Sequence, residues 1–319
     1  MKFRLGYVAI SLTLEDFFHF RTLSYSNYQK LKEEEQRKRL DEIIRHNFNV
    51  LKKILYYNID NHIYFYRMSH NIIPLATHDK VKLDYIQPYQ KEWKEIGDII
   101  KKYKLRVDIH PDQFCVLNSH RVEVVENSFK ILEFNQKIFN AMDYDDGKII
   151  LHIGSSVNGK EASMLRFEEN FKKLDSSIQK RIILENDDKV YTIEDTLFLC
   201  EKLNIPMVLD YHHYLCHHTK YNIKEYLNRI FSTWKHSQLS PKIHFSSPKS
   251  KKEKRAHSFY IEFKGFKKFL DCIELFNIDI DIMLECKGKD EALFRLMRQL
   301  KANNIVQDSD YYFQIKQLP

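Results

Sequence analysis

The sequence predicts an α/β protein built as a single (β/α)8 barrel, the TIM-barrel fold. Short apolar runs of strand character alternate along the chain with longer segments that have helical spacing. Eight such units follow one another, and no linker rich in Pro, Gly or Ser divides them. Alternating strands and helices form parallel sheets, and a chain of 319 residues is long enough for one such barrel.

The expected strands are short apolar runs, several of which end at a histidine or a carboxylate. They cover residues 3–10, 63–68, 105–110, 148–153, 181–185, 206–210, 242–246 and 280–285. Apolar residues three and four positions apart, typical of helices packed on a core, recur between them. The expected helices cover residues 34–57, 88–103, 122–142, 164–176, 193–203, 223–234, 261–273 and 291–302.

The alternative architecture is an open, doubly wound sheet. That fold usually carries a Gly-rich phosphate loop after its first strand, but this chain has seven glycines in all and no such loop. We therefore expect one barrel domain over residues 1–302 and a C-terminal tail of uncertain structure over residues 303–319.

The composition excludes several other classes of protein. With 43% hydrophobic and 30% charged residues the chain is not disordered, and no apolar run approaches the roughly 20 residues of a membrane helix. The first residues pass directly into a strand pattern, without the features of a signal peptide. Five scattered cysteines, without a C-x-x-C pair, indicate reduced thiols. We expect a soluble, cytoplasmic protein.

In a barrel of this kind the C-terminal ends of the strands meet at one rim. The polar residues expected there are His78, His110, His152, Glu185, Asp210, His213, His244, His257 and Glu285. Each one alone is more simply explained as a helix cap or as a partner of the backbone. Together, however, the carboxylates would repel one another without cations, and imidazole with carboxylate suits divalent Zn, Mn or Fe. The set predicts a metal site.

A carboxylate-bridged metal site beside basic residues indicates hydrolysis of phosphodiesters, because bound ions activate water and stabilise charge on the attacking and leaving oxygens. The net charge of +7 agrees with an anionic partner. The segment between His244 and His257 carries a basic cluster made of Lys249, Lys251, Lys252, Lys254 and Arg255. Most such runs are solvated loops, but the place of this one favours contact with phosphates. Phe114, which follows Gln113, is the type of side chain that inserts between stacked bases, although packing within the loop is the simpler explanation.

The ordered motifs of this rim resemble those of the ultraviolet-damage DNA endonucleases, barrel nucleases related to endonuclease IV. The resemblance runs from Leu5-Gly6-Tyr7 to Glu285-Cys286-Lys287-Gly288-Lys289, which is most of the chain. Between these lie Ile73-Pro74-Leu75-Ala76-Thr77-His78, His110-Pro111-Asp112-Gln113-Phe114, Leu151-His152-Ile153-Gly154, Leu184-Glu185-Asn186-Asp187, Asp210-Tyr211-His212-His213, Pro241-Lys242-Ile243-His244 and Ala256-His257-Ser258-Phe259. The resemblance implies an enzyme that incises the damaged strand of duplex DNA immediately 5′ to cyclobutane pyrimidine dimers and 6-4 photoproducts. It also implies incision at abasic sites.

The resemblance also implies roles for individual residues. The nine rim residues named above would hold up to three divalent ions, with manganese favoured over zinc, cobalt or magnesium. The expected catalytic residues are Glu185 and Glu285 as bridging carboxylates, Lys242 as a lysine that the family carries in carboxylated form, and Tyr7 near the scissile phosphate.

The DNA contacts implied by the resemblance lie on the same rim. Gln113 and Phe114 match the pair that probes the damaged site while the lesion is extruded, with Phe114 in place of a tyrosine. Ser11 replaces an asparagine that contacts DNA. The remaining expected contacts are Lys287 and the basic residues Lys249, Lys251, Lys252 and Arg255. No obligate protein partner is implied, and we expect a monomer.

Three alternatives remain open from the sequence. One is an abasic-site endonuclease of the endonuclease IV type, without specificity for photoproducts. Another is a sugar isomerase of the same barrel architecture, although a small sugar needs neither a basic loop nor the Gln113–Phe114 pair. The third is a lesion-binding protein whose metal cluster is structural.

Overall fold

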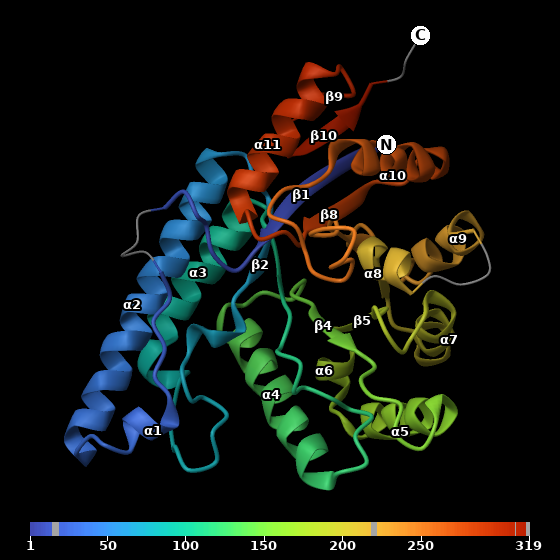
Figure 1. The fold of residues 1–319 in the computed structure, drawn as a ribbon. Helices are drawn as coiled ribbons and strands as arrows, with labels where there is room; N and C mark the ends of the chain where they lie inside the picture. Colours follow the sequence, from blue (N-terminus) through green and yellow to red (C-terminus); the bar gives the residue numbers. More distant parts are fainter. Residues whose placement is uncertain (15–18, 218–221, 310, 317–319) are drawn as a thin grey trace.

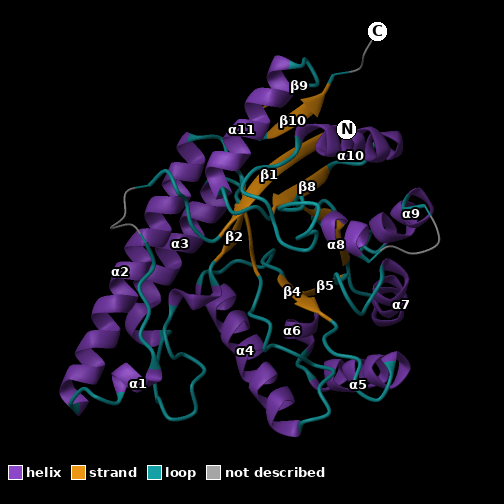
Figure 2. Ribbon diagram, viewed as in Figure 1, coloured by secondary structure: helices purple, strands orange, loops and turns teal. Residues whose placement is uncertain are grey.

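The computed structural model describes residues 1–14, 19–217, 222–309 and 311–316, and its centre is a closed parallel barrel (Figures 1 and 2). The barrel strands are β1 (Lys2–Val8), β2 (Phe65–Met68), β3 (Arg106–Ile109), β4 (Ile149–His152), β5 (Ile182–Glu185), β6 (Met207–Asp210), β7 (Lys242–Phe245) and β8 (Ile280–Leu284). Each strand pairs with the next in the chain, and β1 closes the ring because it pairs in parallel with both β8 and β2. The predicted (β/α)8 fold is confirmed.

The long helices surround the strands and lie close to the predicted ranges (Figure 1). They are α2 (Glu33–Asp60), α3 (Gln90–Lys102), α4 (Val122–Ala141), α5 (Lys160–Lys173), α7 (Ile193–Leu203), α9 (Lys224–Ser232), α10 (Phe263–Ile273) and α11 (Lys289–Ala302). Their spacing buries one face: in α2, Leu40, Ile44 and Leu51 are at most 3% exposed. The 3-10 turn η3 (Gln87–Tyr89) forms the start of the helix predicted over residues 88–103. The short helices α1 (Tyr25–Tyr28), α6 (Ser176–Gln179) and α8 (Tyr211–Cys216), and the 3-10 turns η2 (His70–Ile72) and η4 (Glu274–Phe276), were not predicted as separate elements.

A network of buried charges ties opposite sides of the barrel together. Asp281 on β8 accepts bonds from Arg4 on β1 (2.5 Å) and Arg106 on β3 (2.6 Å). Asp108 on β3 lies 3.1 Å from the Nζ of Lys242 on β7 and 3.4 Å from the Nε of Arg106. Since β3 and β7 are four places apart in the ring of eight, the Asp108–Lys242 pair spans the barrel interior. Every carboxylate in this network has two cationic partners, which offsets the cost of burying it.

Two described stretches of residues 303–319, the predicted tail of uncertain structure, form strands of the sheet. Strands β9 (Val306–Ser309) and β10 (Tyr312–Ile315) make an antiparallel hairpin, and β10 pairs antiparallel with the first residues of β1. The ring of Phe313 lies 5.6 Å from the ring of Phe3 and is buried. The last described residues are therefore joined to the barrel wall.

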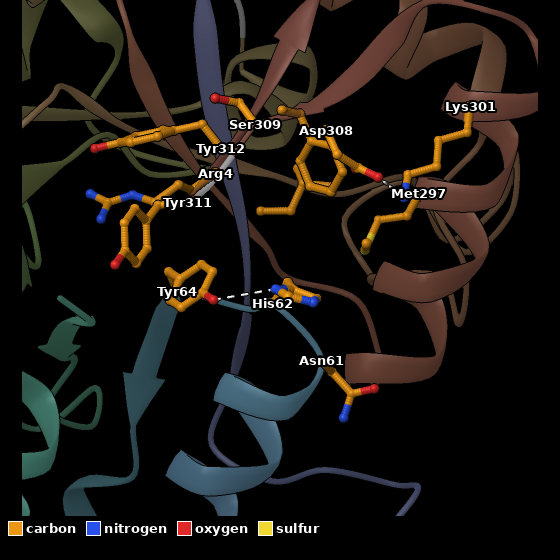
Figure 3. A pocket seen from close by; sticks show the side chains of 12 residues that line it. Arg4, Asn61, His62, Tyr64, Met297, Lys301, Asp308, Ser309, Tyr311 and Tyr312 are labelled. Atoms are coloured by element: carbon orange, nitrogen blue, oxygen red, sulfur yellow. Dashed lines mark hydrogen bonds and ion pairs between the residues drawn. The ribbon is translucent and has the colours of Figure 1, made fainter. Parts of the chain in front are cut away.

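Between this hairpin, β1 and α11 lies a cavity of about 350 Å³. Figure 3 shows its lining, which includes Tyr64, Tyr311, Tyr312 and Lys301. Tyr64 immediately precedes β2, so the cavity opens at the N-terminal ends of the strands. It lies at the opposite end of the barrel from the residues that the sequence predicts to bind metal.

Among the described residues, no helix combines the length and the apolar character needed to cross a membrane.

Candidate metal centre

Most of the predicted metal ligands converge at the C-terminal ends of the strands. They form two adjoining groups, one of His110, His152 and Glu185 and the other of Glu185, Asp210, His244 and Glu285. Within each group one ligand atom per residue lies within 4.8 Å of the others. Glu185 belongs to both groups, so its carboxylate is placed where two ions would share a ligand.

The two oxygens of Glu185 face different histidines. Oε1 lies 3.0 Å from His244 Nδ1 and 3.5 Å from His213 Nδ1. Oε2 lies 3.4 Å from His110 Nε2 and 3.8 Å from His152 Nε2. Burial opposes the charged form, but His244 and His152 hold the pKa of Glu185 well below its usual range. The last residue of β5 is therefore an ionised carboxylate between two pairs of imidazoles.

Asp210 ends β6 and at the same time begins α8. Its Oδ1 accepts a hydrogen bond from the backbone N–H of His213 (2.7 Å), which makes Asp210 the N-cap of that short helix. The cap explains the Asp-x-x-His spacing, because the first helical turn brings His213 back over the strand end. Burial raises the pKa of Asp210 well above its usual range; the charge of His213 opposes this shift, and the charges of Glu185 and Glu285 add to it. A divalent cation beside this carboxylate would favour its ionised form.

Several buried atoms of the centre have no hydrogen-bond partner among the described residues. They are Nδ1 of His152, Oε2 of Glu185, Oδ2 of Asp210 and both ring nitrogens of His244. Leaving buried polar atoms unpaired is costly, and a divalent ion would accept these lone pairs. Imidazole nitrogens with carboxylate oxygens are a donor set for Mn, Zn or Fe. The residues present fit a metal centre.

Glu285 meets a residue that the sequence did not point to. The guanidinium of Arg67 on β2 forms an ion pair with Oε1 of Glu285, which lies 3.1 Å from His244 Nδ1. Burial opposes ionisation, but Arg67 and His244 lower the pKa of Glu285. The pattern of polar residues at strand ends does not point to Arg67, because Arg67 lies inside a strand. Only the register in which its strand pairs would have indicated that it reaches the site. His257 Nδ1 contacts the backbone oxygen of Glu285, and its ring lies 6.4 Å from that of His213.

His78 is not in either group. Its ring stacks on Tyr25 at 3.9 Å, and it lines a cavity of about 280 Å³ together with His70 and Asp112. The structure thus gathers His110, His152, Glu185, Asp210, His213, His244 and Glu285, places His257 at their edge, and leaves His78 on the neighbouring loop. A ligand role for His78 stays a prediction.

Two of the predicted catalytic residues are completely buried. Burial lowers the pKa of Lys242 to about 8, although Asp108 acts in the opposite direction. The hydroxyl of Tyr7 donates to Asn58 Oδ1 (2.7 Å), and burial raises the pKa of Tyr7 well above its usual range. A role for Tyr7 near the scissile phosphate stays a prediction, because its hydroxyl is bonded to α2.

The predicted DNA contacts differ in how they are placed. Gln113 and Phe114 are exposed on the loop after β3, with the Phe114 side chain 64% accessible. Ser11 is 2% exposed, and its hydroxyl donates to Asp290 (2.6 Å). In this structure Ser11 supports a turn, and its contact with DNA stays a prediction.

The predicted basic contacts are all exposed or partly exposed. Lys251, Lys252 and Lys287 form no ion pair with another described residue. Lys249 is paired with Glu253 and Arg255 with Asp188, each at 2.7 Å.

Asn186 and Asp187, which had no expected role beyond the rim, shape it. The side chain of Asn186 donates to the backbone oxygen of Asp210 (3.0 Å) and accepts from its N–H (2.9 Å). This two-way bond joins the ends of β5 and β6 and holds Glu185 against Asp210. Asp187 accepts from the backbone N–H groups of Lys189 (2.7 Å) and Tyr191 (3.0 Å), which fixes the following turn.

The fold and the site define a class: parallel barrels with a histidine and carboxylate metal centre at the C-terminal rim. Residues 3–312 match the family model described as UV-endonuclease UvdE. A protein from Bacillus cereus strain G9842 named UV DNA damage endonuclease is 41% identical over 303 residues, which cover 95% of this chain and 96% of that protein. The chain belongs to the UV-endonuclease UvdE family.

Solved structures agree with this assignment. The crystal structure of SacUVDE is 34% identical, with a TM-score of 0.85 over 94% of this chain and 99% of that one. Endonuclease IV from Thermus thermophilus has a TM-score of 0.56 over 94% of this chain and 98% of its own, at 12% identity. The second likeness concerns the fold alone.

Proposed function

We propose that this protein is a metal-dependent DNA repair endonuclease that incises the damaged strand immediately 5′ to cyclobutane pyrimidine dimers, 6-4 photoproducts and abasic sites. The observation that carries the proposal is the pair of adjoining ligand groups that share Glu185. The names of its relatives, UV DNA damage endonucleases, supply the substrate class.

The proposed centre takes up to three divalent ions, with manganese as the favoured metal. Bound ions supply Lewis acidity to the scissile phosphate and lower the pKa of a water molecule. The chain supplies the geometry: Glu185, which belongs to both ligand groups, would be shared between ions, Asn186 holds the ends of β5 and β6 together, and the cap at Asp210 orients His213. Arg67 holds the carboxylate of Glu285 next to His244.

Lys242 is proposed to be carboxylated. A pKa of about 8 leaves a useful fraction of its amine neutral near pH 8, and only the neutral amine reacts with CO₂. Asp108 would give up its ion pair with Lys242 but keep Arg106 (3.4 Å) and the backbone N–H of Lys148 (3.1 Å). Protein prepared in ¹³C-bicarbonate should show a carbamate carbon signal that Lys242→Met protein lacks.

The loop that carries Gln113 and Phe114 is proposed to probe the lesion. Hollows of about 280 Å³ and 220 Å³ lie along it, and Asp112 lines both. The smaller hollow is also lined by His110 and His152 of the metal centre. An exposed aromatic beside open space is suited to fill the gap left in a base stack when a nucleotide is extruded.

Nicking of ultraviolet-irradiated supercoiled plasmid tests the proposal. The enzyme with Mn²⁺ should convert irradiated plasmid to the open circle, leave undamaged plasmid intact, and lose activity in EDTA. Equal nicking of irradiated and undamaged plasmid contradicts the proposal.

The endonuclease IV fold favours one alternative, an abasic-site endonuclease without photoproduct specificity. Duplexes that contain either one abasic site or one cyclobutane dimer separate the two activities. Incision of the abasic duplex alone supports the alternative.

A further inference from the structure

Two exposed aromatic residues lie on the loop between β7 and α10, at the rim of the metal centre. The side chain of Phe259 is 45% accessible and that of Tyr260 is 37% accessible. Their rings pack edge to face at 4.8 Å, and the guanidinium of Arg295 on α11 lies 4.4 Å from the centre of the Tyr260 ring. We refer to Phe259, Tyr260 and Arg295 as the aromatic platform.

The platform is held firmly by backbone bonds. The N–H of Gly288 donates to the oxygen of Phe259, and the N–H of Lys287 donates to the oxygen of Ser258, each at 2.9 Å. A Cβ at position 288 would lie 2.5 Å from the oxygen of Phe259, so only glycine allows this close approach. Because the backbone that carries the rings is held before any ligand arrives, contact with them requires less ordering of the chain.

The rings of the platform and Phe114 lie on loops that follow well-separated strands of the barrel. Phe259 comes two residues after His257, which contacts Glu285, whereas Phe114 comes four residues after His110, which faces Glu185. The two aromatics follow β7 and β3, which are four places apart in the closed ring of eight strands. A duplex that crosses the rim to reach the metal centre would meet one aromatic on each side.

The charge around the platform fits an anionic backbone. Lys287 and Arg295 are both exposed, and neither forms an ion pair with another described residue. Exposed aromatic rings interleaved with unpaired cations are the usual surface for contact with nucleic-acid strands. Continuity with the metal centre favours the substrate itself over a separate protein partner.

We propose that the aromatic platform is a second DNA-contacting surface, which binds the arm of the duplex on the side of the metal centre away from Phe114. Phe259 stacks on a base or packs on a deoxyribose, while Lys287 and Arg295 contact the adjacent phosphates. This inference rests on the proposed DNA incision. It adds that the duplex is held on both sides of the incised bond.

Single-turnover incision of a duplex with one cyclobutane dimer, in Mn²⁺, tests the platform. The variant Phe259→Ala should raise the half-saturating enzyme concentration by about tenfold, the size expected when an aromatic ring no longer stacks on a base, with the maximal rate unchanged. Phe259→Trp should restore the half-saturating concentration of the wild type. The matched control is Phe198→Ala, which removes a phenylalanine of similar exposure (55%) from α7.

The location of the contact is tested by shortening the duplex from each end in turn. Removal of one arm should raise the half-saturating concentration of the wild-type enzyme. It should also abolish the difference in that concentration between the wild type and Phe259→Ala. If the variant saturates like wild type, the platform does not bind DNA and a protein partner becomes the better assignment. If the penalty survives removal of both arms, Phe259 acts through His257 at the metal centre. A wild-type enzyme that fails to incise contradicts the proposed function instead.

Discussion

At Glu185 one carboxylate faces four imidazoles, two on each oxygen. Few arrangements of side chains allow this, because it requires ligands from β3, β4, β6–α8 and β7 to meet a residue on β5. Because Glu185 belongs to both ligand groups, its negative charge is common to them.

Replacement of Glu185 by glutamine keeps the shape and removes that charge. Glu185→Gln should lower the incision rate by at least about 10³-fold, since several kcal/mol of charge stabilisation are lost with the ions. Titration with Mn²⁺ should show fewer bound ions per chain. The control Glu201→Gln alters a carboxylate that is 41% exposed and paired with Arg229, and it should behave like wild type. Retained incision with unchanged metal binding would contradict a bridging role.

A second carboxylate, Asp290, stabilises the fold through its charge. Its carboxylate accepts bonds from the Ser11 hydroxyl (2.6 Å), the Leu12 N–H (2.7 Å) and the Tyr57 hydroxyl (2.7 Å). Burial opposes the charge, but the bonds from Ser11 and Leu12 prevail and lower the pKa of Asp290.

Asp290→Asn should reduce the free energy of unfolding by about 2 kcal/mol near pH 7, because an amide accepts weaker bonds and has one acceptor instead of two. A lowered folded-state pKa gives stability that is present above the unfolded-state value of about 4 and lost as the pH falls through the folded-state pKa. The difference from wild type in urea unfolding should therefore shrink toward about pH 3. A difference independent of pH would contradict this account, and Asp98→Asn, 59% exposed, is the control.

At the scale of elements, the barrel wall is completed by the β9–β10 hairpin. Strand β1 pairs with β10 over its first residues and with β2 over its last, so one edge of β1 has two partners in succession. Phe313 on β10 is 7% exposed and packs against Phe3.

Phe313→Ala should lower the free energy of unfolding by about 3 kcal/mol, as is usual when a buried phenylalanine leaves a cavity. Leu275→Ala, at a side chain 71% exposed, should change it by less than about 0.5 kcal/mol. Thermal or urea unfolding of both variants makes the comparison. Equal stability of the two would mean that the hairpin is not part of the folded core.

The elements that the sequence predicted share a strong pattern. Buried parallel strands leave continuous apolar runs, so the residues that end them, such as His152 and Glu185, could be assigned to one rim. Each strand of the β9–β10 hairpin has only four residues, and neither is a continuous apolar run that the local sequence would distinguish from a loop. Likewise, Arg67 and Asp290 act through partners more than 200 positions away, a pairing that local pattern does not reveal.

In the whole molecule, the positions of the positive side chains say more about DNA binding than the net charge of +7 does. Lys251 and Lys252 are exposed and unpaired among the described residues, on the same loop that supplies His257. A protein that binds duplex DNA through these lysines should show a strong dependence of affinity on salt.

The variant Lys251→Ala/Lys252→Ala should reduce the slope of log affinity against log salt by about two, one for each phosphate that the protein no longer neutralises. Fluorescence anisotropy with a labelled lesion duplex over a salt series gives the slope. Lys180→Ala/Lys235→Ala, in loops that precede β5 and β7, removes the same charge from the opposite end of the barrel and should leave the slope unchanged. Equal slopes for all three proteins would place the DNA elsewhere.

We propose that the ligand groups around Glu185 form the centre that cuts DNA beside a lesion. The most direct measurement follows incision of an end-labelled duplex that contains one cyclobutane dimer, by wild-type and Glu185→Gln protein with Mn²⁺. The wild type should give one product that ends immediately 5′ to the dimer, and neither the variant nor an EDTA-treated sample should give it. Cleavage of the undamaged strand at equal rate, or an equally active Glu185→Gln protein, would contradict the claim.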